Sequence, residues 1–212
     1  MKLKVLFFFM ITLSCFAQQD TLSTQKFDDF VSVKMQGPVT KMDTIMDNLE
    51  INAAVSGVEN SVFVFQRLKV GNSEDMPYDF KSLKDFYTET NKGIVDKTEE
   101  SSGYKLLDTT IVDISGFKAL RSSFGENKNK KIEFIVLYLG GYMYSFAYTN
   151  ALDYNEKEKT DYFKSITIEE NNPGQFTGES FAYRLGEKLG GLSIVLIVVL
   201  IVVLIIRSKR KK

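Results

Sequence analysis

The sequence has no histidine, and its single cysteine is Cys15. Without histidine, neither a Ser-His-Asp nor a Cys-His nucleophile system can form, and histidine-bearing zinc sites are excluded. The lack of a second cysteine also excludes soft-metal and haem sites of the usual kinds. The chemistry that remains open is carboxylate pairs, a Ser-Lys dyad or oxygen-ligated calcium and magnesium.

The acidic residues that come closest to a calcium site are Asp43, Asp47 and Glu50, which would share one face of a helix. Their spacing lacks the glycine and the alternating ligands of an EF-hand loop, so we interpret them as a solvated helix face. No glycine-rich phosphate loop and no pair of acids at catalytic spacing is present. The sequence therefore predicts a protein that is not an enzyme, with no catalytic, cofactor-binding or metal site.

Residues 1–17 have the three parts of a secretory signal peptide. Two lysines precede an apolar run at 5–13, and small residues follow at Cys15 and Ala17. Because the apolar run is too short to span a bilayer, we expect cleavage after Ala17. A lipid-modified Cys15 is the alternative, although Thr12 stands where such a signal prefers leucine. Cleavage would leave a mature chain without cysteine and hence without a disulfide.

Residues 189–206 contain only leucine, isoleucine and valine apart from Gly190, Gly191 and Ser193. As a helix they would be about 27 Å long, close to the hydrocarbon thickness of a membrane. Each apolar residue favours insertion by about 0.3–0.6 kcal/mol at the bilayer centre. A buried core helix would carry a polar face, which this run lacks. We therefore expect one transmembrane helix at 189–206.

The basic segment at 207–212 fixes the expected orientation, because positive residues next to a span stay in the cytoplasm. The whole chain has 27 basic and 27 acidic residues, but seven basic ones lie in the two terminal segments. The part between them therefore has 20 basic and 27 acidic residues, a net charge of −7. We expect a single-pass protein of the inner cell membrane, with an acidic domain outside the cytoplasm that does not bind nucleic acid.

Hydrophobic periodicity predicts one α+β domain at 27–168, preceded by a flexible segment at 18–26. Ser82 and Asp85 have the spacing of a helix start, and a second helix is expected to begin at Asp153. A linker and stalk are expected at 169–188. The expected strands lie at 27–35, 51–54, 62–68, 109–114, 117–124, 132–139 and 142–149.

The clearest local signal is the pair Gly140-Gly141 between two long apolar runs, which is typical of a tight hairpin. Two-residue closure pairs Leu139 with Tyr142 and places Glu133 opposite Tyr148. Both faces of this hairpin are largely apolar, so we expect an antiparallel sheet covered by helices on both sides, an α-β-α sandwich.

Four motifs within 27–168 carry a resemblance to a known family: Gly37-Pro38-Val39, Ser115-Gly116-Phe117-Lys118-Ala119, the Gly140-Gly141 hairpin, and Tyr162-Phe163-Lys164-Ser165-Ile166. Their order resembles the PsbP-like and DcrB-like domain family of extracytoplasmic proteins. The resemblance implies an antiparallel sheet between helices and a role in binding proteins or stabilising assemblies, with no shared catalytic centre. The transmembrane helix departs from the usual plan of that family.

An aromatic stripe marks one face of the hairpin: Tyr142, Tyr144, Phe146 and Tyr148. Such a stripe is more often core than ligand pocket, because aromatic side chains dominate core burial. We therefore expect a membrane-anchored binding or assembly module with an unidentified protein partner. The alternative is a carrier that holds a lipid or another apolar ligand against these four residues.

Overall fold

The computed structural model describes residues 22–46, 49–70, 76–150 and 152–180. Within them no helix is long and apolar enough to cross a membrane. The signal peptide at 1–17 and the span at 189–206 lie outside the described residues. The described elements are β1 (Leu22–Lys26), β2 (Val31–Gln36), β3 (Val39–Met46), β4 (Leu49–Val58), β5 (Ser61–Lys69), α2 (Phe80–Ser102), β6 (Lys105–Ile114), β7 (Phe117–Glu126), β8 (Asn129–Leu139), β9 (Tyr142–Asn150), α3 (Glu156–Lys164) and β10 (Thr167–Ile168).

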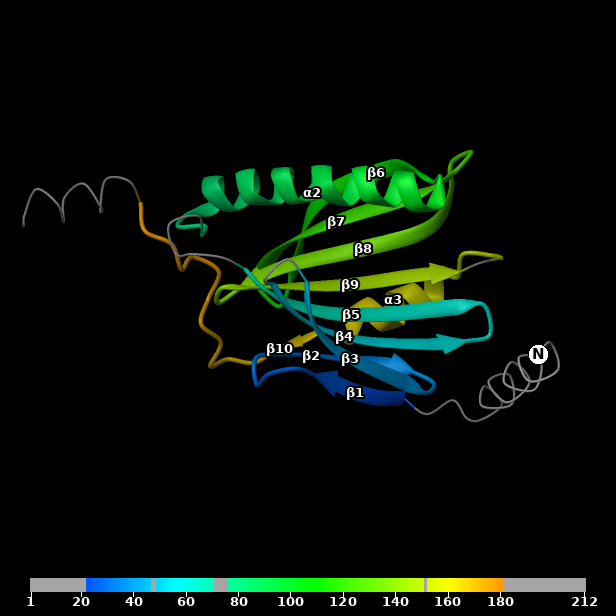
Figure 1. Cartoon of the computed structure of the whole chain (residues 1–212), viewed down its shortest axis with the longest axis horizontal. Coiled ribbons are helices and arrows are strands. Elements are labelled where there is room, and N and C mark those ends of the chain that lie inside the picture. Colours follow the sequence, from blue (N-terminus) through cyan, green and yellow to red (C-terminus); the bar gives the residue numbers. More distant parts are fainter. Residues whose placement is uncertain (1–21, 47–48, 71–75, 151, 181–212) are drawn as a thin grey trace, which may run out of the picture.

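Seven strands form an antiparallel sheet in the order β3-β4-β5-β9-β8-β7-β6 (Figure 1). The β8–β9 hairpin turns at Gly140-Gly141, and both glycines have positive φ angles that a tight turn requires. Leu139 pairs with Tyr142 and Glu133 with Tyr148, so the predicted register of this hairpin is confirmed. The α+β class and the antiparallel sheet are confirmed as well.

Helix α2 covers one face of the sheet at the β6–β8 side (Figure 1). Leu83 and Tyr87 are fully buried there against Leu120, Val136 and Tyr138. The Tyr87 hydroxyl accepts a 2.9 Å hydrogen bond from the Tyr138 N–H and donates one to the Lys118 carbonyl. Helix and sheet are thus joined by hydrogen bonds as well as by apolar packing.

The opposite face is covered by α3 together with a second, three-stranded sheet in the order β1-β2-β10. Val31, Val33 and Met35 of β2 are buried against the large sheet. This differs from the predicted cover by helices alone, since a small sheet covers this face together with α3. The segment expected to be loose before Phe27 contains strand β1, which pairs with β2 over five residues.

Three local predictions were wrong. Asp43 and Glu50 lie on paired strands β3 and β4 and not on a helix face, while Asp47 lies outside the described residues. Helix α2 is capped by Asp79, whose carboxylate accepts from the Ser82 N–H, so the cap lies three residues before Ser82. Helix α3 is capped by Asn155 in place of Asp153.

The segment 169–180, which we call the C-terminal strap, is docked on the domain where a free linker was expected. It runs along one end of the sheet to the start of α2 (Figure 1, orange). Gln175 is 6% exposed, accepts a hydrogen bond from the Lys118 N–H and donates to the Tyr138 carbonyl. The expected linker is therefore part of the folded domain at least as far as Gly178, whose N–H donates to the Pro77 carbonyl.

Candidate functional site

The aromatic stripe lies in the core. Tyr144, Phe146 and Tyr148 have 0% exposed surface, and Tyr142 packs at the edge of the same cluster. Phe146 stacks on Phe65 with a 5.0 Å centroid separation. The Tyr142 ring lies 4.7 Å from the Arg67 guanidinium.

The two buried hydroxyl groups of the stripe already have partners. Tyr144 donates to Asp28, and Tyr148 donates to Glu158 at 3.0 Å. Burial, reinforced by these carboxylates, raises the pKa of both tyrosines. Packing and polar contacts within the domain thus occupy the residues that the carrier hypothesis assigned to a ligand.

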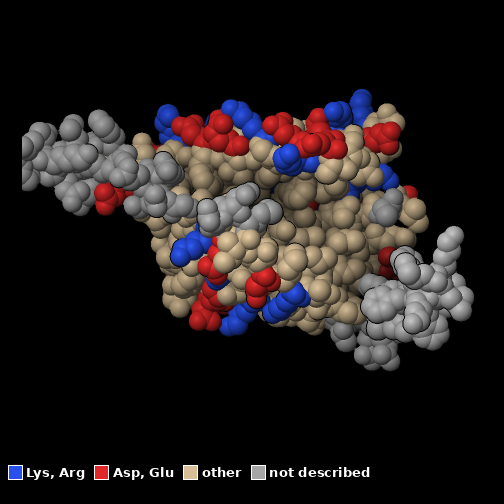
Figure 2. Space-filling model, in the orientation of Figure 1, with Lys and Arg blue, Asp and Glu red and all other residues tan. Residues whose placement is uncertain are grey.

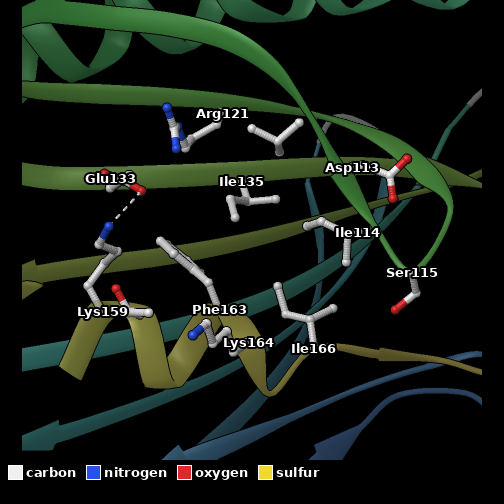
Figure 3. Close-up of a pocket in the computed structure, with 12 residues that line it drawn as sticks. Asp113, Ile114, Ser115, Arg121, Glu133, Ile135, Lys159, Phe163, Lys164 and Ile166 are labelled. Carbon is white, nitrogen blue, oxygen red and sulfur yellow. Dashed lines mark ion pairs between the residues drawn. The ribbon is translucent and has the colours of Figure 1, made fainter. Parts of the chain in front are cut away.

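A groove of about 330 Å³ lies on the same side of the sheet, between α3 and strands β6, β7 and β8 (Figure 3). It forms because α3 covers only the neighbourhood of β9 and leaves β6 and β7 open. Its apolar lining comes from Ile114, Ile135, Phe163 and Ile166. Such a volume falls at the lower end of the range for small-molecule sites.

Glu133 is the buried charge of this groove, with 1% of its surface exposed. Its carboxylate lies 3.6 Å from Lys159 Nζ (dashed in Figure 3) and 3.5 Å from Lys130 Nζ. The Tyr154 hydroxyl donates to it at 3.3 Å, and burial together with this charge raises the pKa of Tyr154. Two ammonium groups and a phenol thus surround this carboxylate and pair its buried charge.

The mouth of the groove is cationic. Arg121 and Lys164 line it, and Arg121 reaches only one carboxylate among the described residues, that of Asp108, at 3.6 Å. Asp113 also lines the groove, but it binds Lys118 and the Gly116 N–H, and these hydrogen bonds lower its pKa. The groove therefore offers an apolar floor and positive charge to a bound molecule.

No catalytic arrangement accompanies this charge pattern in the described residues. That part of the chain has no group of three or more acidic, histidine or cysteine residues that could hold a metal ion. The groove contains hydroxyl groups on Ser115 and Thr160, yet no hydrogen bond joins either to a general base in the described ranges.

Strand β6 forms one edge of the large sheet and contributes Val112 and Ile114 to the groove. On its outer side it pairs with no other described strand. An edge strand presents unpaired backbone donors and acceptors to which an extended segment can add. The groove and this edge lie together and can be engaged by one extended molecule.

Sequence reasoning missed this groove, because its residues come from three strands and one helix that are distant in the chain. One local signal was present. Glu133 is the only acidic residue in the run 132–139, and it alternates on one face with Ile135 and Leu137. A lone acid on a buried strand face must be paired, and its partners mark a polar position next to the core.

A second open surface lies beside α2 on the other face of the sheet, where β3, β4 and β5 are covered by no described helix. Figure 2 shows charged residues gathered along α2 and a broad uncharged area below it. Nothing in the described residues shows what contacts this area, so the groove is the better-defined site. The side chains that share this face have no charge: Thr40, Met42, Thr44, Leu49, Ile51, Ala53, Val55, Val62, Val64, Gln66 and Leu68.

Comparison with known proteins shows a shared fold with solved structures but no closer relationship to any protein. No family model matches the chain, and no curated protein matches it significantly. Among solved structures, the cyanobacterial PsbP protein (CyanoP) of Synechocystis is similar, with a TM-score of 0.50 at 11% identity; the match covers 72% of this chain and 95% of that one. A protein of Bacteroides thetaiotaomicron matches with a TM-score of 0.34 at 10% identity, over 67% of this chain and 46% of that one. The described domain thus has a PsbP-like fold, and the resemblance seen in the sequence is confirmed at the level of the fold.

Proposed function

We propose that this protein is a non-catalytic binding module held at the outer surface of the cell membrane. The signal peptide at 1–17 and the span at 189–206 would supply that location. Membership of the PsbP-like and DcrB-like family, beyond the shared fold, is part of the same proposal. The observation that carries the binding role is the groove between α3 and β8, which opens beside the free edge of β6.

The chemistry of the groove favours an extended peptide segment of a protein partner. Backbone groups of such a segment would pair with β6, and an apolar side chain would enter between Ile135 and Phe163. An acidic side chain or a carboxyl terminus would meet Arg121 and Lys164 at the mouth. Charge at the mouth would select the partner, and the apolar floor would supply most of the affinity.

Site-specific photo-crosslinking in membranes tests this role. A photoreactive residue replaces Thr160, which lines the groove, and in a matched chain it replaces Lys92 on the outer face of α2. We expect one discrete protein adduct from position 160 and none from position 92. Arg121→Glu should reduce that adduct about tenfold or more, because it reverses the charge that receives an acidic group. Equal adducts at both positions, or no adduct at either, would contradict the proposal.

A carrier role is the second candidate, with the ligand in the groove and not against the aromatic stripe, and the volume of the groove is the observation that favours it. The ligand would be a short amphipathic carboxylate, with its chain over Ile135 and its head at Arg121. Native mass spectrometry of the full chain in detergent, with added decanoate, separates the two hypotheses. A stoichiometric adduct that Arg121→Gln removes supports a carrier. An unchanged mass contradicts the carrier hypothesis and leaves only the peptide-binding hypothesis.

A further inference from the structure

The C-terminal strap fixes the place at which the chain leaves the domain. The Glu169 N–H donates to the Phe30 carbonyl at 2.9 Å, and the Gly140 N–H donates to the Gly174 carbonyl at 2.8 Å. The Gly178 N–H then donates to the Pro77 carbonyl at 2.9 Å, just before α2 begins. These three backbone hydrogen bonds, together with those of the Gln175 side chain, hold the strap, and the last of them lies beside the N-terminal end of α2.

The sequence leaves little chain between this point and the expected membrane span. Eight residues, 181–188, separate Ser180 from Leu189. Whatever their conformation, they reach at most about 30 Å when fully extended and about 12 Å as a helix. The polar layer on each side of a bilayer is itself several ångströms thick. The end of the domain that carries Gly178 and the start of α2 is therefore held within about 30 Å of the expected span.

That same end carries all the exposed aromatic side chains of the described residues. Tyr78 is 44% exposed, Phe80 49% and Phe176 51%. Tyr78 directly follows Pro77, and Phe176 lies two residues before Gly178, so the three rings flank the hydrogen bond between the strap and the start of α2. Every other tyrosine and phenylalanine in the described part of the chain is buried or partly buried. Exposed aromatic rings that gather at one place mark a contact surface.

We propose that Tyr78, Phe80 and Phe176 contact the headgroup region of the bilayer in which the chain is anchored, so that the domain rests on the membrane in one fixed orientation. Aromatic side chains favour this interface because their rings accept partial burial, and the tyrosine hydroxyl stays hydrated. The inference rests on the proposed anchor at 189–206. It adds a second contact and an orientation to that anchor.

The charges around the three rings set the kind of lipid contact. Asp79 and Glu179 lie among them, and the Asp79 carboxylate accepts from the Ser82 N–H as the cap of α2. Lys81 is paired with Asp85. Among the described residues, this end thus has no free cluster of cations to attract anionic lipid, and its contact depends on aromatic burial. The contact should form on uncharged phosphatidylcholine and persist in high salt.

The absence of tryptophan from the chain allows a direct test. Phe176→Trp places one fluorophore at the proposed contact. Leu152→Trp places one at a position that is 63% exposed and lies beyond the other end of β9, about 30 Å away. The full chain with each substitution is reconstituted into phosphatidylcholine vesicles, with and without lipid brominated near the headgroup.

We expect bromine to quench the fluorescence of the Phe176→Trp chain at least twofold and to leave that of the Leu152→Trp chain unchanged. Only the Phe176→Trp chain should show a blue-shifted emission. Flotation of the same samples tests the membrane anchor independently of the aromatic contact. A chain that does not float with the vesicles contradicts the proposed anchor.

Two outcomes would overturn the lipid contact while leaving the anchor intact. In the first, both chains float, and the Phe176→Trp chain is no more quenched than the Leu152→Trp chain. In the second, the fluorophore of the Phe176→Trp chain is shielded in native membranes but unquenched in pure lipid vesicles. That result would assign this end of the domain to a protein partner in place of lipid.

Discussion

The Tyr144 hydroxyl donates a 2.6 Å hydrogen bond to Oδ2 of Asp28, and this contact ties the central strand β9 to the loop before β2. The same carboxylate accepts from Arg67 Nη1 at 3.2 Å and from the N–H groups of Phe30 and Val31. Burial alone would raise the pKa of Asp28, but these hydrogen bonds outweigh it and hold the pKa below its usual value. Tyr144, which the carrier hypothesis assigned to a ligand, thus anchors the small sheet to the large one.

Asp28→Asn should destabilise the domain by about 3 kcal/mol at neutral pH, because it leaves Arg67 without its buried partner. Since the folded pKa of Asp28 is lowered, its contribution is full above the unfolded value of 3.8 and is lost as the pH falls through the folded value. Urea unfolding at pH 7 and at about pH 2 checks both points, with the difference between wild type and variant shrinking at the lower pH.

The matched control for this experiment is Asp29→Asn, since the Asp29 side chain is 85% exposed and pairs only with Lys26 among the described residues. Exposed ion pairs contribute little, so the control should unfold at the wild-type urea concentration at both pH values. Equal losses in the two variants would show that the hydrogen bonds of Asp28 do not hold the small sheet in place.

Glu133→Gln tests the buried charge of the groove. It should cost about 3 kcal/mol of unfolding free energy, because Lys159, only 12% exposed, would lose its buried carboxylate partner and retain only the exposed Glu156. Glu156→Gln is the control, since Glu156 binds the same two lysines but is 59% exposed. The double change Glu133→Leu with Lys159→Met should recover most of the loss, as apolar replacements of buried ion pairs do. Additive losses in the double variant, measured by urea unfolding, would contradict this account.

Local signals in the sequence predicted the central hairpin down to its register. Gly140-Gly141 favours a tight turn, and alternation in β8 and β9 then decides which residues face each other. The β3–β4 hairpin has neither signal. Its turn lacks glycine and proline, and the strand residues Lys41, Asp43 and Ile45 are all exposed, so no apolar alternation marks them. The sequence also leaves the start of α2 ambiguous, because two good capping residues, Asp79 and Ser82, stand three positions apart.

The strap and the groove could not be predicted for a different reason. Nothing near Gln175 in the chain indicates that its amide will meet the backbone of Lys118 and Tyr138, which are 57 and 37 residues away. Polar, proline- and glycine-containing segments of this kind usually connect domains. The groove likewise depends on where α3 stops covering the sheet, which is a property of packing and not of any local pattern.

Gln175→Ala should destabilise the domain by about 1–3 kcal/mol and release the strap, because it leaves the Lys118 N–H and the Tyr138 carbonyl unpaired. Hydrogen exchange at 169–180 should quicken, while exchange in β8 and β9 stays slow. Phe176→Ala, at the neighbouring exposed position, should leave both stability and exchange unchanged in detergent. Unchanged exchange in Gln175→Ala would mean that the backbone contacts of the strap hold it without this side chain.

Two glycine-to-alanine changes should act with opposite signs and together test how tightly the strap is docked. A Cβ on Gly178 would overlap the Met76 carbonyl oxygen, so the backbone must move and the strap must leave the start of α2. A Cβ on Gly93 meets no atom within 4 Å, and alanine there should stabilise α2 by about 0.5–1 kcal/mol. The thermal unfolding temperature should therefore rise for Gly93→Ala and fall for Gly178→Ala.

If the strap only rests on the surface, Gly178→Ala will unfold at the wild-type temperature. The orientation proposed for the domain would then lose its structural basis, because a loose strap cannot hold the exposed rings of Tyr78, Phe80 and Phe176 against the membrane. A lower unfolding temperature for Gly178→Ala, combined with weaker bromine quenching when the same change is added to the Phe176→Trp chain, would instead link the docking of the strap to the lipid contact.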